Sequence, residues 1–284
     1  MERRRNPSRE ADTKTGTARL RPVCHALFLG LLLGSGTALA RPPATPLGPS
    51  IVDTGSTQVE TRTFTVPSPD GSEPAYRISV LVPRAAAPRT ARPCVYLLDG
   101  QAALEHLTDD ALAALPRPLP VIVTVGYDTN ERFPVVPRTR DYTPTVGDEP
   151  PVDPLGRRGG GSAAFLDLLQ ETIVPQAEGD LPIDADQRTI WGHSYGGLLV
   201  LEAARRPTSP FARFVAASPS LWWEDGAYLS QLQAQLAEGK MPRRPLTVHV
   251  GAMELVRKSG NSAMERQRAK LEGPANEQLV EAMR

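Results

Sequence analysis

Two segments in the first third of the chain alternate apolar and polar residues. Thr61–Val66 and Tyr76–Val82 repeat with a period of two, which is typical of strands that bury one face. Pro69, Asp70 and Gly71 stand between them and favour a tight turn. The pattern therefore predicts a β-hairpin at the start of the folded region.

Beyond the hairpin the apolar residues form continuous runs. Cys94–Leu98 and Val121–Val125 are short and nearly all apolar, as expected for strands buried on both faces of a parallel sheet. Residues 102–115 between them predict a helix. The alternation then continues with a helix from Ser162 to near Pro175, a strand Thr189–Trp191, a helix over 195–206, a strand Phe214–Ala217, a helix over 226–237 and a strand Leu246–Val250.

A hairpin followed by alternating strands and helices predicts one α/β domain over residues 58–284. We expect a mostly parallel, right-handed doubly wound sheet with helices on both faces. The Pro/Gly-rich residues 41–57 are predicted to be a leader segment, and residues 128–160 a long loop.

The last residues predict a further helix. Asn276 is placed to cap it, and Leu279, Val280 and Met283 form its apolar stripe. In an α/β sheet such a helix normally leads into another strand, and the sequence ends at Arg284 before one. We therefore expect the domain to be truncated before its last strand.

The first forty residues have the pattern of a secretory signal. Arginines precede the apolar run Ala26–Leu33, and Ala38-Leu39-Ala40 matches a small-residue cleavage site. The apolar run is too short to span a bilayer comfortably, which favours cleavage after Ala40 over a membrane anchor. We expect a periplasmic or secreted protein with no stable membrane insertion after cleavage.

Composition narrows the possible functions. The chain carries 32 basic and 32 acidic residues, and nucleic-acid binding relies on a clustered basic excess, so no nucleic-acid partner is expected. At 40% hydrophobic and 23% charged residues, the composition is that of an ordinary globular protein. Cys94 is the only cysteine after residue 40, so the fold depends on its core rather than on an internal disulfide. We find no metal-ligand spacing and no phosphate-binding loop.

The stretch WGHSYGGLLVLEAA (191–204) carries the clearest chemistry. Gly192 to Gly196 fits G-x-S-x-G and lies between a predicted strand and a predicted helix, as a nucleophile elbow requires. Such a turn holds the serine hydroxyl at the carboxyl end of the sheet, at a helix N-terminus. We therefore predict that Ser194 is a nucleophile rather than part of an ordinary Gly/Ser turn. His193 is predicted to point away from it and to pack.

A serine nucleophile also needs two N–H donors for the oxyanion. The amide of Tyr195 follows the nucleophile directly. The amide of Gln101, in the turn Asp99-Gly100-Gln101 after a buried strand, is the candidate for the second donor. An ordinary strand-to-helix turn explains residues 99–101 equally well.

The loop over 128–160 would overhang this site and is rich in arginine. One hypothesis is a basic lid for an anionic, catecholate-like substrate, with Arg138 and Arg140 as binding residues. The other, which we favour, is a solvated loop in which Arg140 and Asp141 fix the local fold. Trp222 and Trp223 either wall an acyl or aromatic pocket or close the core. The arginines of the loop are Arg132, Arg138, Arg140, Arg157 and Arg158.

Five segments carry a family resemblance: YLLDGQ (96–101), RTRDYTP (138–144), GGGSAAFLDLLQETIVPQAE (159–178), GHSYGGL (192–198) and SPSLWW (218–223). Together they resemble an esterase branch of the α/β-hydrolases, and within it the periplasmic siderophore esterases that cut trilactones of the enterobactin and salmochelin type. The resemblance runs from about Val59 to Glu254 and implies serine-dependent hydrolysis of a small-molecule ester, without metal or organic cofactor. Ser194 matches the nucleophile of this family, and Tyr195 and Gln101 match its oxyanion positions.

The catalytic base has no match. The family pattern places a histidine in a loop after a final strand, whereas the histidines here are His25, His106, His193 and His249. His249 lies between valines in a predicted strand, which is more typical of packing. Glu254 stands where the third member of a triad would follow, or is a solvated carboxylate. The resemblance thus implies a truncated esterase of doubtful activity. The alternatives are a non-catalytic binding protein on a hydrolase scaffold, or an acyltransferase that uses the same acyl-enzyme.

Overall fold

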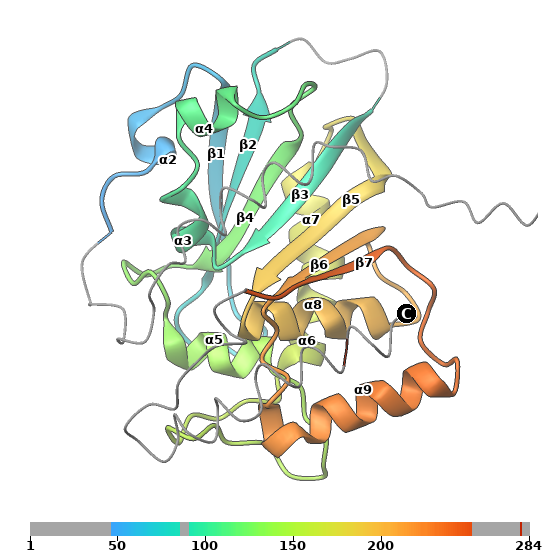
Figure 1. Ribbon diagram of the computed structural model, residues 1–284. Helices are drawn as coiled ribbons and strands as arrows, with labels where there is room; N and C mark the ends of the chain where they lie inside the picture. The colour runs from blue at the N-terminus through green and yellow to red at the C-terminus, as the bar shows by residue number, and fades with distance from the viewer. Residues whose placement is uncertain (1–46, 86–90, 252–278, 280–284) are drawn as a thin grey trace, which may run out of the picture.

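The computed structural model describes residues 47–85, 91–251 and Leu279. A seven-stranded mixed sheet runs through it in the order β1-β2-β4-β3-β5-β6-β7 (Figure 1). The antiparallel hairpin β1–β2 is confirmed, and β2 also pairs antiparallel with β4, whereas the remaining neighbours pair in parallel. The strands are β1 (Val59–Val66), β2 (Tyr76–Pro83), β3 (Arg92–Leu98), β4 (Val121–Tyr127), β5 (Ile183–His193), β6 (Arg213–Ala217) and β7 (Leu246–His249).

Helices cover both faces of this sheet, which confirms the predicted α/β architecture. Alternate residues of β3 show the division, because Tyr96 and Leu98 belong to one buried cluster while Val95 and Leu97 belong to the other. The second cluster is covered by α2 (Ile51–Thr54), α3 (Gly100–Leu104) and α4 (Asp109–Ala113). The first is covered by α6 (Ser162–Leu168), α7 (Val174–Glu178), α8 (Tyr195–Arg205) and α9 (Ala227–Ala237).

Helix α8 is the central helix of this arrangement. It packs on β5 and β6 and also contacts α6 and α5 (Val135–Tyr142). All four residues of its run Leu198–Leu201 are therefore fully buried. A helix with apolar residues on every side is expected where neighbours surround it.

Two predictions about helix boundaries were wrong. The helix expected over 102–115 is two short helices, because the hydroxyl of Thr108 accepts a hydrogen bond from the amide of Ala111 (3.1 Å) and starts α4 anew. The helix expected to end near Pro175 continues through a π-helical turn, Leu169–Ile173, into α7. Pro175 lies just after this π-helical turn, where the regular i→i−4 bonding is already interrupted, so its missing N–H is tolerated.

The segment over 128–160, predicted as a loop, contains α5. Pro137 lies in the first turn of this helix, so the proline pattern that suggested a loop is compatible with a helix start. Its last turns are held by side chains, since the hydroxyl of Thr139 donates to the carbonyl of Val135 and that of Thr143 donates to the carbonyl of Thr139, both at 2.7 Å. Helix α5 lies below the carboxyl ends of β3 and β5 (Figure 1).

The packed domain begins earlier than residue 58. Ile51 of α2 is buried in the second cluster, and the hydroxyl of Ser56 donates to the carboxylate of Asp109 (2.5 Å). Part of the predicted leader is thus part of the core. The predicted signal over 1–40 lies outside the described residues. In the predicted last helix, Leu279 is helical and buried in the first cluster, while the rest of that helix lies outside the described residues.

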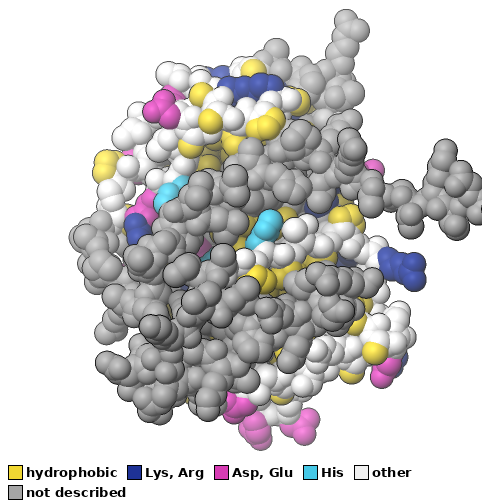
Figure 2. Space-filling view, viewed as in Figure 1, with side chains coloured by type: hydrophobic (Ala, Val, Ile, Leu, Met, Phe, Trp, Pro, Cys, Tyr) yellow, Lys and Arg dark blue, Asp and Glu magenta, His cyan; other side chains and the backbone are white. Residues whose placement is uncertain are grey.

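Among the described residues, every helix is too short or too polar to cross a bilayer. On the face drawn in Figure 2, basic side chains stand apart from one another, and acidic side chains lie mainly along the lower rim and at the upper left. A group of three or more His, Cys, Asp or Glu residues suited to hold a metal ion does not occur in this part of the chain.

Candidate active site

Ser194 lies in the sharp turn between β5 and α8. Its backbone has φ 57° and ψ −115°, a left-handed conformation that L-residues other than glycine seldom adopt. The turn is held by backbone bonds, since the amide of Ser194 donates to the carbonyl of Ala217 (2.9 Å) and its carbonyl accepts from Leu198 (3.0 Å). Strain held in this way at a strand-to-helix turn is the geometry of a nucleophile elbow.

The glycines of the motif are required to different degrees. A Cβ atom on Gly192 would lie far inside van der Waals contact of the carbonyl group of Gly196. A Cβ atom on Gly197 would lie 3.0 Å from the carbonyl oxygen of Ala217. Gly196 has more room, with its nearest neighbours outside the helix at 3.6–3.7 Å. Close approach of two backbones thus explains the first glycine best.

The turn after β6 contacts Ser194 directly. The hydroxyls of Ser194 and Ser220 are 3.0 Å apart, and the amide of Ser220 donates to the carbonyl of Ser194 (3.2 Å). Ser220 is fully buried, and the same turn contains Ser218 at φ 43°. Sequence analysis missed Ser220, although it lies in SPSLWW just beyond β6, where the carboxyl ends of neighbouring parallel strands meet. That position is the signal that could have identified it.

The predicted second oxyanion segment lies on the neighbouring strand. Gln101 stands at the start of α3, directly after β3, and its side-chain amide donates to the carbonyl of Tyr127 while its side-chain oxygen accepts from the amide of Tyr127 (3.3 Å). These bonds fix residues 100–101 against β4. Asp99, the residue before, reaches the elbow, because its carboxylate would lie 3.7 Å from a Cβ atom on Gly196. The amides of Tyr195 and Gln101 therefore come from adjacent turns.

The side chain of Arg138 is bound by other groups of the protein and is largely shielded from solvent. Its guanidinium forms an ion pair with both carboxylate oxygens of Asp99 (2.6 and 2.9 Å) and donates to the carbonyl of His193 (2.9 Å). Its side chain is 11% exposed. Burial alone would lower the pKa of Arg138, but the Asp99 carboxylate outweighs this effect and raises that pKa.

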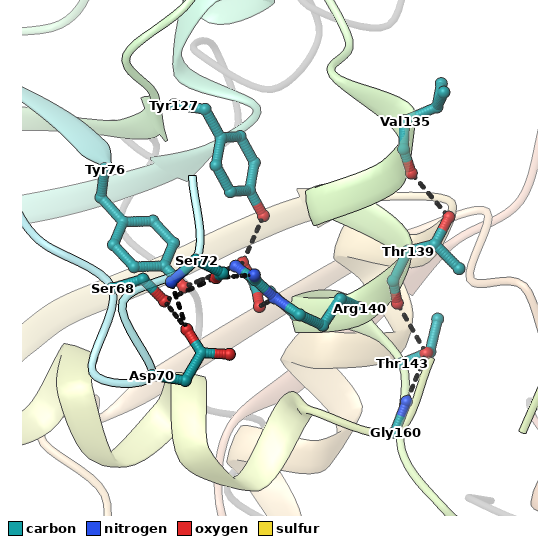
Figure 3. A network of polar contacts seen from close by, with 11 residues as sticks. Ser68, Asp70, Ser72, Tyr76, Tyr127, Val135, Thr139, Arg140, Thr143 and Gly160 are labelled. Atoms are coloured by element: carbon teal, nitrogen blue, oxygen red, sulfur yellow. Dashed lines mark hydrogen bonds and ion pairs between the residues drawn. The ribbon is translucent and has the colours of Figure 1, made fainter. Parts of the chain in front are cut away.

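Arg140 is likewise engaged, as Figure 3 shows. It pairs with the buried carboxylate of Asp141 (2.6 Å), which also accepts hydrogen bonds from the hydroxyls of Tyr76 and Tyr127, both at 2.9 Å. The hydrogen bond to Asp141 raises the pKa of Arg140, and burial raises the pKa of Tyr76. This geometry favours the hypothesis in which Arg140 and Asp141 fix the local fold, and Arg138 makes contacts of the same kind. Substrate binding by Arg138 and Arg140 stays a prediction.

Two of the other three arginines of the segment also form ion pairs. Arg157 pairs with the buried Asp153, and Arg132 pairs with Glu105. Arg158 is exposed and forms no ion pair within the described residues.

The two tryptophans differ in their surroundings. Trp223 is 1% exposed, and its indole N–H donates to the carbonyl of Pro144 (2.9 Å), so it closes the core under the loop. Trp222 is half-buried and its ring lies 5.7 Å from the ring of Tyr195. The hydroxyl of Tyr195 donates to Asp153 (3.4 Å), which joins the loop to the residue after the nucleophile.

The remaining candidate residues are Glu254 and the histidines. Residue Glu254 lies outside the described residues. His193 and His249 are the last residues of β5 and β7, and both stand in register with Ala217 of β6. The carbonyl of His249 accepts from the amide of Ser218 (2.7 Å), while His106 is exposed in the turn after α3.

Comparisons with known proteins agree with this geometry. Residues 72–272 match the model of the family described as "Putative esterase". The apo-salmochelin esterase of Escherichia coli O6:H1 is 38% identical over 227 residues, covering 78% of this chain and 69% of that protein. The ferri-bacillibactin esterase BesA of Bacillus subtilis is 33% identical over 190 residues, covering 63% of this chain and 65% of that protein.

Solved structures give the same result. The enterobactin hydrolase IroE in complex with DFP superposes with a TM-score of 0.60 at 30% identity, covering 80% of this chain and 99% of that one. The siderophore hydrolase EstA from Aspergillus nidulans superposes with a TM-score of 0.60 at 26% identity, covering 78% of this chain and 80% of that one. The strained serine, the sheet order and these matches lead to one conclusion: the chain belongs to this esterase family and has the α/β-hydrolase fold.

Proposed function

We propose that this esterase hydrolyses siderophore esters through an acyl-enzyme on Ser194. The observation that carries the proposal is the strained backbone of Ser194 at the end of β5, with the β3–α3 turn beside it. The substrate class is supported by relatives named for salmochelin, bacillibactin and enterobactin.

In the first half of the reaction, the Ser194 oxygen attacks the ester carbonyl and its proton passes to a general base. Negative charge then develops on the former carbonyl oxygen, and the amides of Tyr195 and Gln101 donate hydrogen bonds to it. Collapse of this intermediate breaks the ester C–O bond, releases the alcohol and leaves an acyl group on Ser194. In the second half, water attacks the acyl group and the acid is released.

The hydroxyl of Ser220 has a defined place in this scheme. While Ser194 donates its proton to the base, Ser220 donates to the Ser194 oxygen from 3.0 Å away. A bond of this kind holds the nucleophile in one rotamer and strengthens as that oxygen gains negative charge.

The test is hydrolysis of a catecholate trilactone siderophore and of a short aryl ester by the purified chain, beside Ser194→Ala. The matched control is Ser230→Ala, since Ser230 is an exposed serine on α9. We expect turnover that Ser194→Ala lowers by about 10⁴- to 10⁶-fold and Ser230→Ala leaves unchanged. A folded protein that binds the trilactone with equal affinity before and after Ser194→Ala, and turns over neither ester, would be a binding protein instead.

The base is identified in the same assay. His249→Ala and His193→Ala exchange the histidines at the carboxyl edge of the sheet. If His249 accepts the proton, His249→Ala abolishes turnover as completely as Ser194→Ala and shifts the acid limb of the pH–rate profile. Addition of an alcohol acceptor separates hydrolysis from acyl transfer, because a transferase yields the new ester in place of the free acid.

We further propose that residues 1–40 direct export and are removed after Ala40, which places the esterase in the periplasm or outside the cell. The support is the basic and apolar pattern of that segment. Mass spectrometry of the protein recovered from the exported fraction tests this, and a mature chain that still begins at Met1 would contradict it.

A further inference from the structure

Arg138 touches two segments that each contribute to the proposed oxyanion hole. Its guanidinium binds Asp99, which follows β3, and the carbonyl of His193, which ends β5. Asp99 is two residues before Gln101, and His193 is two residues before Tyr195. One side chain from α5 thus joins the turns that carry both proposed donors.

Asp99, at the start of the β3–α3 turn, is held by contacts from α5. Asp99 has φ 55° and ψ 52°, a left-handed conformation that aspartate tolerates better than most residues with a Cβ atom. Its amide donates to the hydroxyl of the buried Tyr142 (3.2 Å), and its carboxylate takes both bonds of the Arg138 fork. Both groups that hold Asp99 come from α5.

Arg138 also lies close to the aromatic residue that follows Ser194. The guanidinium of Arg138 lies 5.5 Å from the ring centroid of Tyr195 and 5.4 Å from that of Tyr142, within the range of cation–π attraction. It therefore sits between the residue after the nucleophile and the aromatic residue that holds Asp99. In this enclosed position the ion pair and the carbonyl bond form one rigid unit.

We infer that Arg138 and Asp99 are positioning residues that hold the Gln101 and Tyr195 amides at the spacing the oxyanion requires. The inference rests on the proposed function of those amides and adds the two residues that set the distance between them. Neither side chain is assigned to the reacting atoms.

The shape of the guanidinium explains why arginine is needed. A planar fork donates to a carboxylate with two nitrogens and, from the same Nη2, to the His193 carbonyl, whereas a lysine ammonium is a point charge without this fixed geometry. Arg138→Lys therefore keeps the charge and loses the geometry. A shift of the donors by a fraction of an ångström weakens a hydrogen bond that is strongest in the transition state.

The chain offers a matched control. Arg188 binds Glu178 through two nitrogens (2.6 and 2.7 Å) and also donates to a backbone carbonyl, that of Pro210 (2.5 Å). Its side chain is 13% exposed, close to the 11% of Arg138. Arg188 stands five residues before His193 on β5, away from the elbow. Arg188→Lys should thus cost similar stability without moving the donors.

The experiment compares Arg138→Lys, Asp99→Asn, their double variant and Arg188→Lys in the full chain. We expect Arg138→Lys and Asp99→Asn each to lower kcat for the aryl ester about 10- to 100-fold with KM within about twofold. The double variant should fall little further, because both changes break one unit. Arg188→Lys should keep kcat within about twofold.

Hydrogen exchange supplies a readout that needs no turnover. In Arg138→Lys, amides in peptides covering 99–104 and 192–198 should exchange faster together, while Arg188→Lys leaves both unchanged. The inference is overturned if Arg138→Lys loses no more kcat than Arg188→Lys, or if only α5 exchanges faster. Turnover that survives Ser194→Ala would instead remove the proposed function, and the exchange data would still decide whether the two turns are coupled.

Discussion

The variants Gly192→Ala and Gly196→Ala test whether the elbow needs a glycine for steric reasons at both positions of the motif or at only one. A Cβ atom on Gly192 would meet the Gly196 carbonyl group far inside van der Waals contact and would lie 2.8 Å from Cδ1 of Leu98. The carbonyl belongs to the backbone and cannot rotate away, so β5 and the first turn of α8 must separate. A Cβ atom on Gly196 meets only ordinary contacts of 3.6–3.7 Å outside its own helix.

The sizes of the two effects follow from these distances. Overpacking of a buried site costs about 1–3 kcal/mol, and displacing a reacting group by about 1 Å can cost about 100-fold in rate. Gly196→Ala, by contrast, replaces a helical glycine and should stabilise by up to about 1 kcal/mol. Gly197 is intermediate, because its Cβ atom would lie 3.0 Å from Ala217 and Pro219 backbone atoms.

The assay measures thermal unfolding and the rate at which a fluorophosphonate labels Ser194. Labelling should be slowest in Gly192→Ala, intermediate in Gly197→Ala and close to that of the parent chain in Gly196→Ala. Equal losses in folded Gly192→Ala and Gly196→Ala would refute the steric reasoning, and would indicate that Gly196 contacts the bound molecule instead.

Three further changes test other parts of the structure. Ser220→Ala should lower kcat about 10- to 100-fold with an unchanged KM, since a hydrogen bond to a charged oxygen contributes about 1.5–3 kcal/mol; a loss under twofold would contradict its role beside Ser194. Asp141→Asn should lower the free energy of unfolding in urea by about 3–5 kcal/mol, because it leaves the Arg140 charge unpaired near two buried tyrosines, and a loss under about 1 kcal/mol would count against this network. Hydrogen bonds from Ser56 and Thr57 lower the pKa of Asp109 from 3.8 to about 2, so its stabilisation is present above pH 4 and is lost as the pH falls through 2. The difference in Tm between Asp109→Asn and the parent chain should therefore shrink steadily from pH 5 to pH 2, and a constant difference would be inconsistent with this shift.

The strands and the elbow could be predicted because their signals are local. A strand buried on both faces must be apolar throughout, and β3 and β4 extend the predicted runs Cys94–Leu98 and Val121–Val125 by only two residues each. The elbow requires a glycine two residues before Ser194, since the backbones of β5 and α8 touch there. In both cases the physical constraint acts on residues close together in the chain.

Helix α5 could not be predicted in the same way, because proline has opposite meanings at the start and in the interior of a helix. Pro134 and Pro137 looked like loop residues when the start of the helix was unknown. The bonds that hold this helix in place, from Tyr142 and Arg138 to Asp99, join residues about forty positions apart. No local pattern contains that information.

The arginines of the 128–160 segment show why charge alone does not identify a substrate site. The sequence presents Arg138, Arg140 and Arg158 alike, but burial without a partner would be costly for any of them, so a buried arginine needs acceptors inside the protein. Arg138 and Arg140 have theirs in Asp99 and Asp141, whereas Arg158 is exposed. An arginine that neutralises an internal carboxylate has little charge left to attract an anionic ligand. We therefore expect the positive charge of Arg138 and Arg140 to stabilise the local fold rather than to bind an anionic ligand.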